Sequence, residues 1–150
     1  MQVVMNLLTN SIKFTPKGQS IQIRVTLLDV KNLNIESECS ESIDGRQVHQ
    51  RNISPENMIE CAARFAIEIK DTGVGISEEN LPKIFMDFMK LDEHSQMNPN
   101  GTGIGLSICK YIVEKMNGHI SVQSKKEVGT TFRIDIATKI KLNKSIILQY

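Results

Sequence analysis

Three groups of residues in this chain have the types and spacing of a nucleotide-binding site. Two of them are glycine-rich blocks, residues 71–76 (DTGVGI) and 101–106 (GTGIGL). Because glycine lacks a Cβ, such blocks allow the backbone to approach a ligand closely and to adopt positive φ angles. The third group is Asn6, Asn10 and Lys13, whose spacing places the side chains along one stripe of a helix. Together they predict a nucleotide site assembled from separate parts of the chain.

The stripe of Asn6, Asn10 and Lys13 could contact a metal ion and phosphates. A carboxamide oxygen is a hard neutral ligand, and Mg²⁺ prefers a few oxygen ligands from the protein together with phosphate oxygens of the substrate. The ammonium group of Lys13 would add a positive charge for phosphate. The plainer interpretation is a solvated polar face. However, asparagine is a poor residue for a helix interior, so two on one stripe require an explanation.

The two glycine blocks suggest contacts to the two ends of a nucleotide. Asp71 follows an apolar strand, and its carboxylate could accept a hydrogen bond from an exocyclic amine such as that of adenine. The simpler alternative is a carboxylate that only caps a turn. Residues 101–105 open a helix, where free N–H groups and the helix dipole favour an anion; the alternative is a hinge loop. No Gly-Lys-Ser/Thr follows this block and no strand precedes it, which argues against a Walker A loop and a dinucleotide fingerprint.

The elements that must position these groups follow from the hydrophobic periodicity. Residues 1–14 form an amphipathic helix, whose predicted apolar face is Val3, Val4, Leu7, Leu8 and Ile12. A second helix is predicted from Ser77, carrying Leu81, Ile84, Phe85 and Phe88, and a third over residues 105–116. Alternating apolar residues predict strands at 21–28, 63–70, 120–124 and 130–136. This order favours an α+β fold, with helices on one face of a mostly antiparallel sheet.

Composition narrows the class of protein. The chain has 150 residues, enough for one domain, and its 18 basic and 17 acidic residues leave a net charge of +1. This balance gives no electrostatic reason to expect nucleic acid or membrane contact by the domain. Three widely spaced cysteines form neither a disulfide framework nor a metal site. We expect a cytoplasmic domain that belongs to a larger protein, and a membrane anchor elsewhere in that parent protein is left open.

The order of the motifs resembles a known family. Residues 6–10 (NLLTN), Lys13-Phe14, the first glycine block, residues 84–88 (IFMDF) and the second glycine block follow one another as in the ATP-binding catalytic domain of histidine kinases. That family shares a superfamily with gyrase B, Hsp90 and MutL. The resemblance implies the Bergerat ATP-binding fold, a two-layer α/β sandwich with a mixed, mainly antiparallel sheet. The domain is expected over residues 1–138, N-terminally truncated and with a polar insertion at about 30–58; residues 139–150 are a tail or linker.

The resemblance also implies roles for individual residues. Asn10 would be the Mg²⁺ ligand with Asn6 as a helper, and Lys13 would contact phosphate, so Asn10 and Lys13 are the predicted catalytic residues. Phe14 would lie near the adenine, and Asp71 would bind its amine. Further contacts to ATP are implied for Gly73, Gly75, Ile76, Phe85, Gly101, Thr102, Gly103, Ile104, Gly105, Leu106 and Thr130. Residues 94–100 would be a short lid over the phosphates.

The activity implied is transfer of the γ-phosphate of Mg-ATP to a histidine on a separate dimerisation domain, with a response regulator receiver domain downstream. None of His49, His94 and His119 is followed by an acidic residue, so the acceptor histidine is expected outside this chain. One alternative is a gyrase-like or Hsp90-like ATPase, which is disfavoured because residues 1–5 contain no glutamate to act as a base. The other is a nucleotide-binding interaction module without phosphotransfer.

Overall fold

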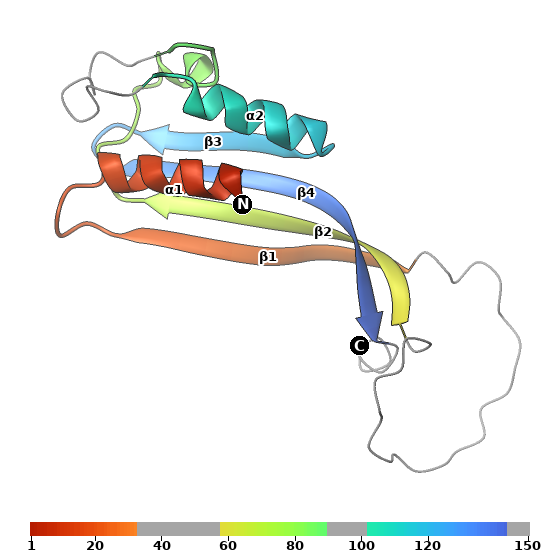
Figure 1. Cartoon of the computed structure of the whole chain (residues 1–150). Coiled ribbons are helices and arrows are strands. Elements are labelled where there is room, and N and C mark those ends of the chain that lie inside the picture. The colour runs from red at the N-terminus through yellow and green to blue at the C-terminus, as the bar shows by residue number, and fades with distance from the viewer. Residues whose placement is uncertain (33–57, 90–101, 144–150) are drawn as a thin grey trace, which may run out of the picture.

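The computed structural model describes residues 1–32, 58–89 and 102–143, which form two layers (Figure 1). The elements, in chain order, are α1 (Gln2–Phe14), β1 (Ile21–Asn32), β2 (Met58–Asp71), the 3₁₀-helix η2 (Leu81–Lys83), α2 (Gly105–Lys115), β3 (His119–Lys125) and β4 (Gly129–Asn143). This architecture confirms the predicted α+β class. Within the described ranges, no helix is long and apolar enough to cross a membrane.

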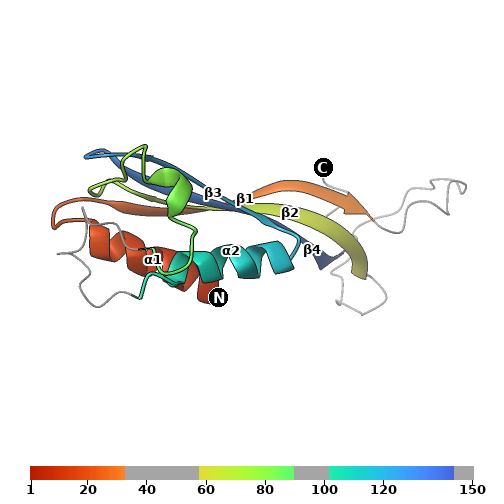
Figure 2. The same cartoon turned by 90° about the horizontal axis from the view of Figure 1, so that it is seen from above.

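The four described strands form one sheet in the order β1-β2-β4-β3, and each neighbouring pair is antiparallel. Both helices lie on the same face of this sheet, as Figure 2 shows from above. The register places Asp71, the last residue of β2, opposite Thr130 near the start of β4. The two residues that the sequence analysis expected at the adenine therefore meet at one end of adjacent strands.

The core lies between the helices and the sheet. Its buried members come from α1, β2, the segment 76–84, α2, β3 and β4, and they are Val3, Leu7, Ile69, Ile76, Ile84, Cys109, Val113, Ile120, Phe132 and Ile134. Half-buried Leu106 and Phe85 pack against this cluster. The helix that begins at the second glycine block is thus fixed to the sheet by apolar contacts from its first turn onward.

The buried face of α1 differs from the predicted one at its C-terminal end. Val3 and Leu7 are buried as expected, but the side chain of Ile12 is 60% exposed while that of Ser11 is only 2% exposed. The buried stripe follows the i, i+4 row of Val3, Leu7 and Ser11, which lies on one side of a helix. The prediction for Ile12 was therefore wrong, and a hydroxyl takes the inward position instead.

The apolar alternation in β1 predicted a strand correctly but did not indicate burial. Ile23, Val25 and Leu27 are 48%, 64% and 53% exposed, although they pair with β2 residues on the helix-facing side. The reason is the position of the strand: β1 lies at one edge of the described sheet, and the two helices lie over the other strands (Figure 1). The strand also continues to Asn32, into the range predicted as an insertion.

The helix predicted from Ser77 does not form. Only η2, a single short 3₁₀ turn, is present there, and it has Pro82 in its first turn. Proline lacks a backbone N–H, which limits it to the start of a helix. Phe88 then adopts a φ of 59°, which no α-helix accommodates. At the other end of the chain, β4 continues to Asn143 and so includes the first residues of the predicted tail.

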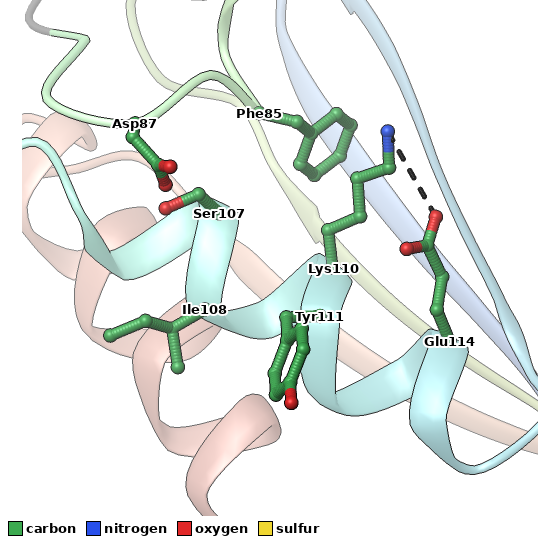
Figure 3. Close-up of a pocket in the computed structure, with 7 residues that line it drawn as sticks. All are labelled: Phe85, Asp87, Ser107, Ile108, Lys110, Tyr111 and Glu114. Carbon is green, nitrogen blue, oxygen red and sulfur yellow. Dashed lines mark ion pairs between the residues drawn. The ribbon is translucent and has the colours of Figure 1, made fainter.

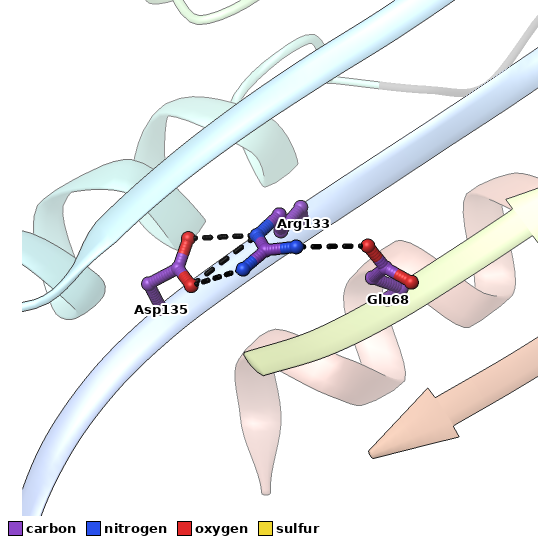
Figure 4. A network of polar contacts seen from close by, with 3 residues as sticks. All are labelled: Glu68, Arg133 and Asp135. Atoms are coloured by element: carbon purple, nitrogen blue, oxygen red, sulfur yellow. Dashed lines mark hydrogen bonds and ion pairs between the residues drawn. The ribbon is translucent and has the colours of Figure 1, made fainter. Parts of the chain in front are cut away.

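A charged cluster on β2 and β4 joins the two central strands (Figure 4). Arg133 pairs with Asp135 two residues further along β4, with 2.9 Å between Nη2 and Oδ1. The same guanidinium also reaches Glu68, directly opposite on β2, with 3.1 Å between Nη1 and Oε1. The hydrogen bonds from Arg133 lower the pKa of Asp135, against a smaller opposing effect of partial burial.

This lowered pKa predicts an acid-dependent contribution to stability. A carboxyl group whose pKa is lower in the folded than in the unfolded state stabilises the fold above its ordinary pKa of about 4. That contribution is lost as the pH falls through the lower, folded-state pKa. We therefore expect Asp135→Asn to be less stable than the wild type near neutral pH and to converge with it at about pH 2. Urea unfolding followed by circular dichroism across this range checks this; an equal difference at both ends would contradict it.

Candidate functional site

Asp71 lies at the centre of a network of buried polar groups. Its Oδ1 accepts hydrogen bonds from the backbone N–H of Gly73 (3.0 Å) and of Thr130 (3.1 Å). Its Oδ2 accepts one from the Ser11 hydroxyl of α1 (3.0 Å). The side chain is only 5% exposed. A helix, a loop and two strands thus converge on one carboxylate, and they fix its orientation.

The donor set around Asp71 fits an amine ligand. A carboxylate has about four lone-pair sites, and three are used by the donors named above. Those donors are a hydroxyl and two backbone amides, and they leave the carboxylate the capacity for one further hydrogen bond. The remaining site on Oδ2 suits an N–H donor such as the exocyclic amine of a base.

Two serines that the sequence analysis did not single out belong to this network. Ser11 holds Asp71, and Ser124 on β3 lies 2.8 Å from the Thr130 hydroxyl, oxygen to oxygen. Both have a signal in the sequence. Ser11 follows Leu7 in the apolar row of α1, and Ser124 continues the alternation of Ile120 and Val122. A lone hydroxyl at an otherwise apolar position needs a partner when it is buried.

Two glycines of the first block, Gly73 and Gly75, are required because other backbone segments of the chain pack closely against them. A Cβ at Gly73 would lie 2.2 Å from the Phe14 carbonyl oxygen, and one at Gly75 would lie 2.0 Å from the Lys125 carbonyl oxygen. The sequence analysis expected these glycines to admit a ligand. The structure shows that they admit the backbone of α1 and of the β3–β4 turn, which locks the loop beside Asp71.

The stripe on α1 is partly open to solvent. Asn6 and Asn10 are half-buried, as is Phe14, whereas Lys13 is exposed. The helix end is tied to the first glycine block, since the N–H of Val74 donates to the Phe14 carbonyl oxygen at 3.1 Å. This contact and the Ser11–Asp71 hydrogen bond attach the stripe to the carboxylate.

Asn6 also faces α2, where it contacts Cys109. Burial raises the pKa of the Cys109 thiol, and a hydrogen bond with Asn6 acts in the opposite direction. The thiol is fully buried and also donates to the Val3 carbonyl oxygen, with 3.8 Å between sulfur and oxygen. Cys109 is therefore a neutral packing residue that joins α2 to α1 beside the predicted metal stripe.

The second glycine block leads into α2. Gly103 has a φ of 75°, and its Cα lies so near the Phe88–Met89 backbone that a Cβ would be 2.7 Å from the Phe88 carbonyl carbon. Ile104 is the N-cap, Gly105 is the first helical residue, and Leu106 packs on the core. Thr102 is exposed. Gly101 and the lid predicted at 94–100 lie outside the described residues.

Phe85 is the predicted site residue that lies apart from this network. It lines a cavity of about 330 Å³ on the outward face of α2 (Figure 3). The other residues that line it are Asp87, Ser107, Ile108, Lys110, Tyr111 and Glu114. None of them is among the predicted ATP contacts, and Lys110 is paired with Glu114 one turn further along α2. Among the predicted ATP contacts, only Phe85 lines this cavity.

The donors available for a metal ion are neutral amides. In the described ranges, no group of three or more His, Cys, Asp or Glu side chains is arranged to hold a metal ion. Mg²⁺ does not require such a group, because it keeps several waters and often takes substrate phosphates with only one or two protein ligands. Asn10 and Asn6 fit that mode of binding and not an all-protein cage.

Comparison with known proteins assigns the family. Residues 1–140 match the family model described as "Histidine kinase-, DNA gyrase B-, and HSP90-like ATPase". The chain belongs to this family. Several curated histidine kinases are similar to it, and the chain is accordingly an ATP-binding catalytic domain of the histidine kinase type.

Three relatives illustrate the similarity. Histidine kinase 5 of Arabidopsis thaliana is 30% identical over 93% of this chain, the peroxide stress-activated histidine kinase mak2 of Schizosaccharomyces pombe is 38% identical over 87%, and the autoinducer 2 sensor kinase/phosphatase LuxQ of Vibrio vulnificus is 33% identical over 90%. The chain spans only 14%, 5% and 12% of these proteins, respectively.

Solved structures agree on the fold. The mycobacterial sensor histidine kinase MprB superposes with a TM-score of 0.61 at 21% identity, covering 91% of this chain and 70% of that one. The catalytic domain of histidine kinase ThkA gives a TM-score of 0.53 at 23% identity, covering 91% and 65%. The histidine kinase domain thus has the same arrangement of helices over an antiparallel sheet.

Proposed function

We propose that this domain binds Mg-ATP beside α1, with the adenine at Asp71, and donates the γ-phosphate to a histidine on a separate dimerisation domain. The observation that carries the proposal is the buried Asp71 carboxylate, held by Gly73, Thr130 and Ser11 with one acceptor site left. A buried polar group is costly unless its hydrogen-bonding capacity is met, and a donor from the ligand would fill the remaining site.

The base end of the site would recognise the adenine amine through Asp71. The three protein donors fix the carboxylate plane, so little rotational freedom is lost when a ligand adds the fourth hydrogen bond. Phe14 and Ile76 would supply apolar contacts to the base, and Thr130 would supply a hydroxyl. The further predicted ATP contacts, Gly73 and Gly75, act by holding the loop against the backbone of the chain.

The phosphate end would be formed by α1 and by the start of α2. Asn10 and Asn6 would hold Mg²⁺, which when bound neutralises part of the phosphate charge. Lys13 is exposed at the C-terminal end of α1, where it can reach a phosphate as a point charge. The free N–H groups from Gly103 to Leu106 and the dipole of α2 favour an anion at the helix N-terminus, and Gly101 and Thr102 would extend this contact.

Phosphoryl transfer would require a partner, since the catalytic work is mainly positioning and charge neutralisation. The proposed partner is the dimerisation domain of the parent kinase, which would carry the acceptor histidine, and the phosphoryl group would pass on to a response regulator receiver domain. His119 begins β3 and is followed by Ile120, without the adjacent acidic residue that could assist proton removal.

The test of transfer uses this chain with the dimerisation domain of its own parent protein and radiolabelled ATP. We expect acid-labile, base-stable phosphate on the dimerisation domain only when both parts are present, and none when Asn10 is replaced by Ala. ATP binding without any transfer to that domain would support the nucleotide-binding interaction module instead. Steady-state hydrolysis by the isolated domain would support the ATPase alternative.

A further inference from the structure

The Ser124 hydroxyl on β3 connects several segments of the site. Its Oγ accepts a hydrogen bond from the backbone N–H of Ile76 (2.9 Å), in the loop that follows Asp71. It donates to the Gly129 carbonyl oxygen at 2.9 Å. It also lies 2.8 Å from the Thr130 Oγ1. One hydroxyl therefore joins the first glycine block to the start of β4.

The number of contacts matches the capacity of a hydroxyl. A serine hydroxyl has one proton to donate and two lone pairs to accept. With the proton on Gly129, the lone pairs take the Ile76 N–H and the Thr130 hydroxyl, and every group is satisfied. An apolar side chain here would leave the half-buried N–H and hydroxyl without this partner. Since Thr130 donates its backbone N–H to Asp71, Ser124 is one step from the carboxylate.

We propose that Ser124 is a positioning residue that sets the geometry of the base end of the nucleotide site. The inference rests on the proposed function, and it assigns Ser124 to selectivity for the base. By holding Ile76 and Thr130 at a fixed separation, the hydroxyl keeps the Thr130 N–H on Asp71 Oδ1. Oδ2 is then free to accept from the amine of the ligand.

A change in base preference follows from this arrangement. Adenine has an amine, a donor, where guanine has a carbonyl oxygen, an acceptor. A rigid carboxylate holds an acceptor oxygen against the position of the guanine oxygen, and two acceptors repel each other. A carboxylate that is free to rotate can turn away, so it discriminates less between the two bases. Loss of the Ser124 hydroxyl should therefore weaken the binding of adenine nucleotides more than the binding of guanine nucleotides. Contacts to the phosphates should stay unchanged.

The experiment compares three ligands by calorimetry in the presence of Mg²⁺: the ATP analogue AMPPNP, the GTP analogue GMPPNP and inorganic tripolyphosphate. The variants are Ser124→Ala, which removes the hydroxyl, and Ser124→Thr, which retains it. Ser121→Ala is the matched control, since Ser121 lies on the same strand and points to the opposite face of the sheet. Circular dichroism establishes that each variant is folded.

We expect Ser124→Ala to bind AMPPNP about tenfold more weakly than the wild type, because the partly buried hydrogen bonds that fix the base end of the site are lost. Its preference for AMPPNP over GMPPNP should fall, its tripolyphosphate affinity should stay the same, and Ser124→Thr and Ser121→Ala should retain the preference. An unchanged preference in folded Ser124→Ala overturns the proposal. If Ser124→Ala does not fold, the ratio of AMPPNP affinity to GMPPNP affinity in Ser124→Cys tests the proposal in its place. A folded wild type that binds no AMPPNP overturns the proposed function itself.

Discussion

Replacing Asp71 by asparagine is expected to weaken AMPPNP binding on the order of 100-fold while leaving the domain folded. Asparagine has the same shape, but its NH₂ group replaces one carboxylate oxygen. Because the backbone N–H groups of Gly73 and Thr130 need an acceptor, the amide oxygen takes the place of Oδ1. The NH₂ group then faces the adenine amine, so a donor meets a donor, whereas the Ser11 hydroxyl can turn and accept from it. Calorimetry on both proteins measures the loss.

Ser11→Ala is the matched control for this prediction. It removes one neutral donor from Oδ2 and leaves both carboxylate oxygens as acceptors. The expected loss is therefore small, about threefold in affinity, because the ligand amine keeps its partner. A folded Asp71→Asn variant that binds AMPPNP as well as Ser11→Ala would contradict the assignment of Asp71 as the acceptor for the base.

Replacing Gly75 by alanine is expected to destabilise the fold by about 3 kcal/mol or more. Gly75 has a φ of 67°, a left-handed conformation that is strained for a residue with a Cβ. The new Cβ would lie 2.0 Å from the Lys125 carbonyl oxygen and 2.7 Å from its carbon. These are backbone atoms, which cannot rotate away as a side chain can. Urea unfolding followed by circular dichroism measures the free energy of unfolding.

Gly105→Ala is the control for that effect. Gly105 is the first residue of α2, and a Cβ there would meet no atom within 4 Å. Alanine is a better helix former than glycine, so this variant should be as stable as the wild type or more stable by up to about 1 kcal/mol. Equal stability of Gly75→Ala and Gly105→Ala would show that the loop beside Asp71 is not locked by the β3–β4 turn.

Periodicity and composition predicted most of the fold. The helical row of α1, the alternation in β2 and the helix after Gly105 were each marked by apolar spacing, and each is present. The helix expected from Ser77 failed because Pro82 and the left-handed Phe88 leave only a short 3₁₀ turn. The exposure of Val25 could not be predicted either, since alternation identifies a strand without saying whether it lies at an edge.

The candidate site was predicted in part. Asp71 and Thr130 were named from the sequence, and the register of β2 and β4 brings them together. Their supporting hydroxyls, Ser11 and Ser124, were not named, because serine at a buried position resembles a surface residue until its partner is known. Phe85 was assigned to ATP by resemblance, and that role stays a prediction; in the structure it lines a cavity beside α2.

The measurement that tests the central claim most directly is a two-dimensional NMR titration of the isotope-labelled domain with AMPPNP and Mg²⁺. The account predicts that amide shifts concentrate in α1 from Asn6 to Phe14, in residues 71–76, in residues 103–107 and at Thr130. It also predicts that Mg²⁺ is required for the shifts at Asn6 and Asn10. Shifts confined to the Phe85–Tyr111 cavity, or no shifts in a folded domain, would contradict it.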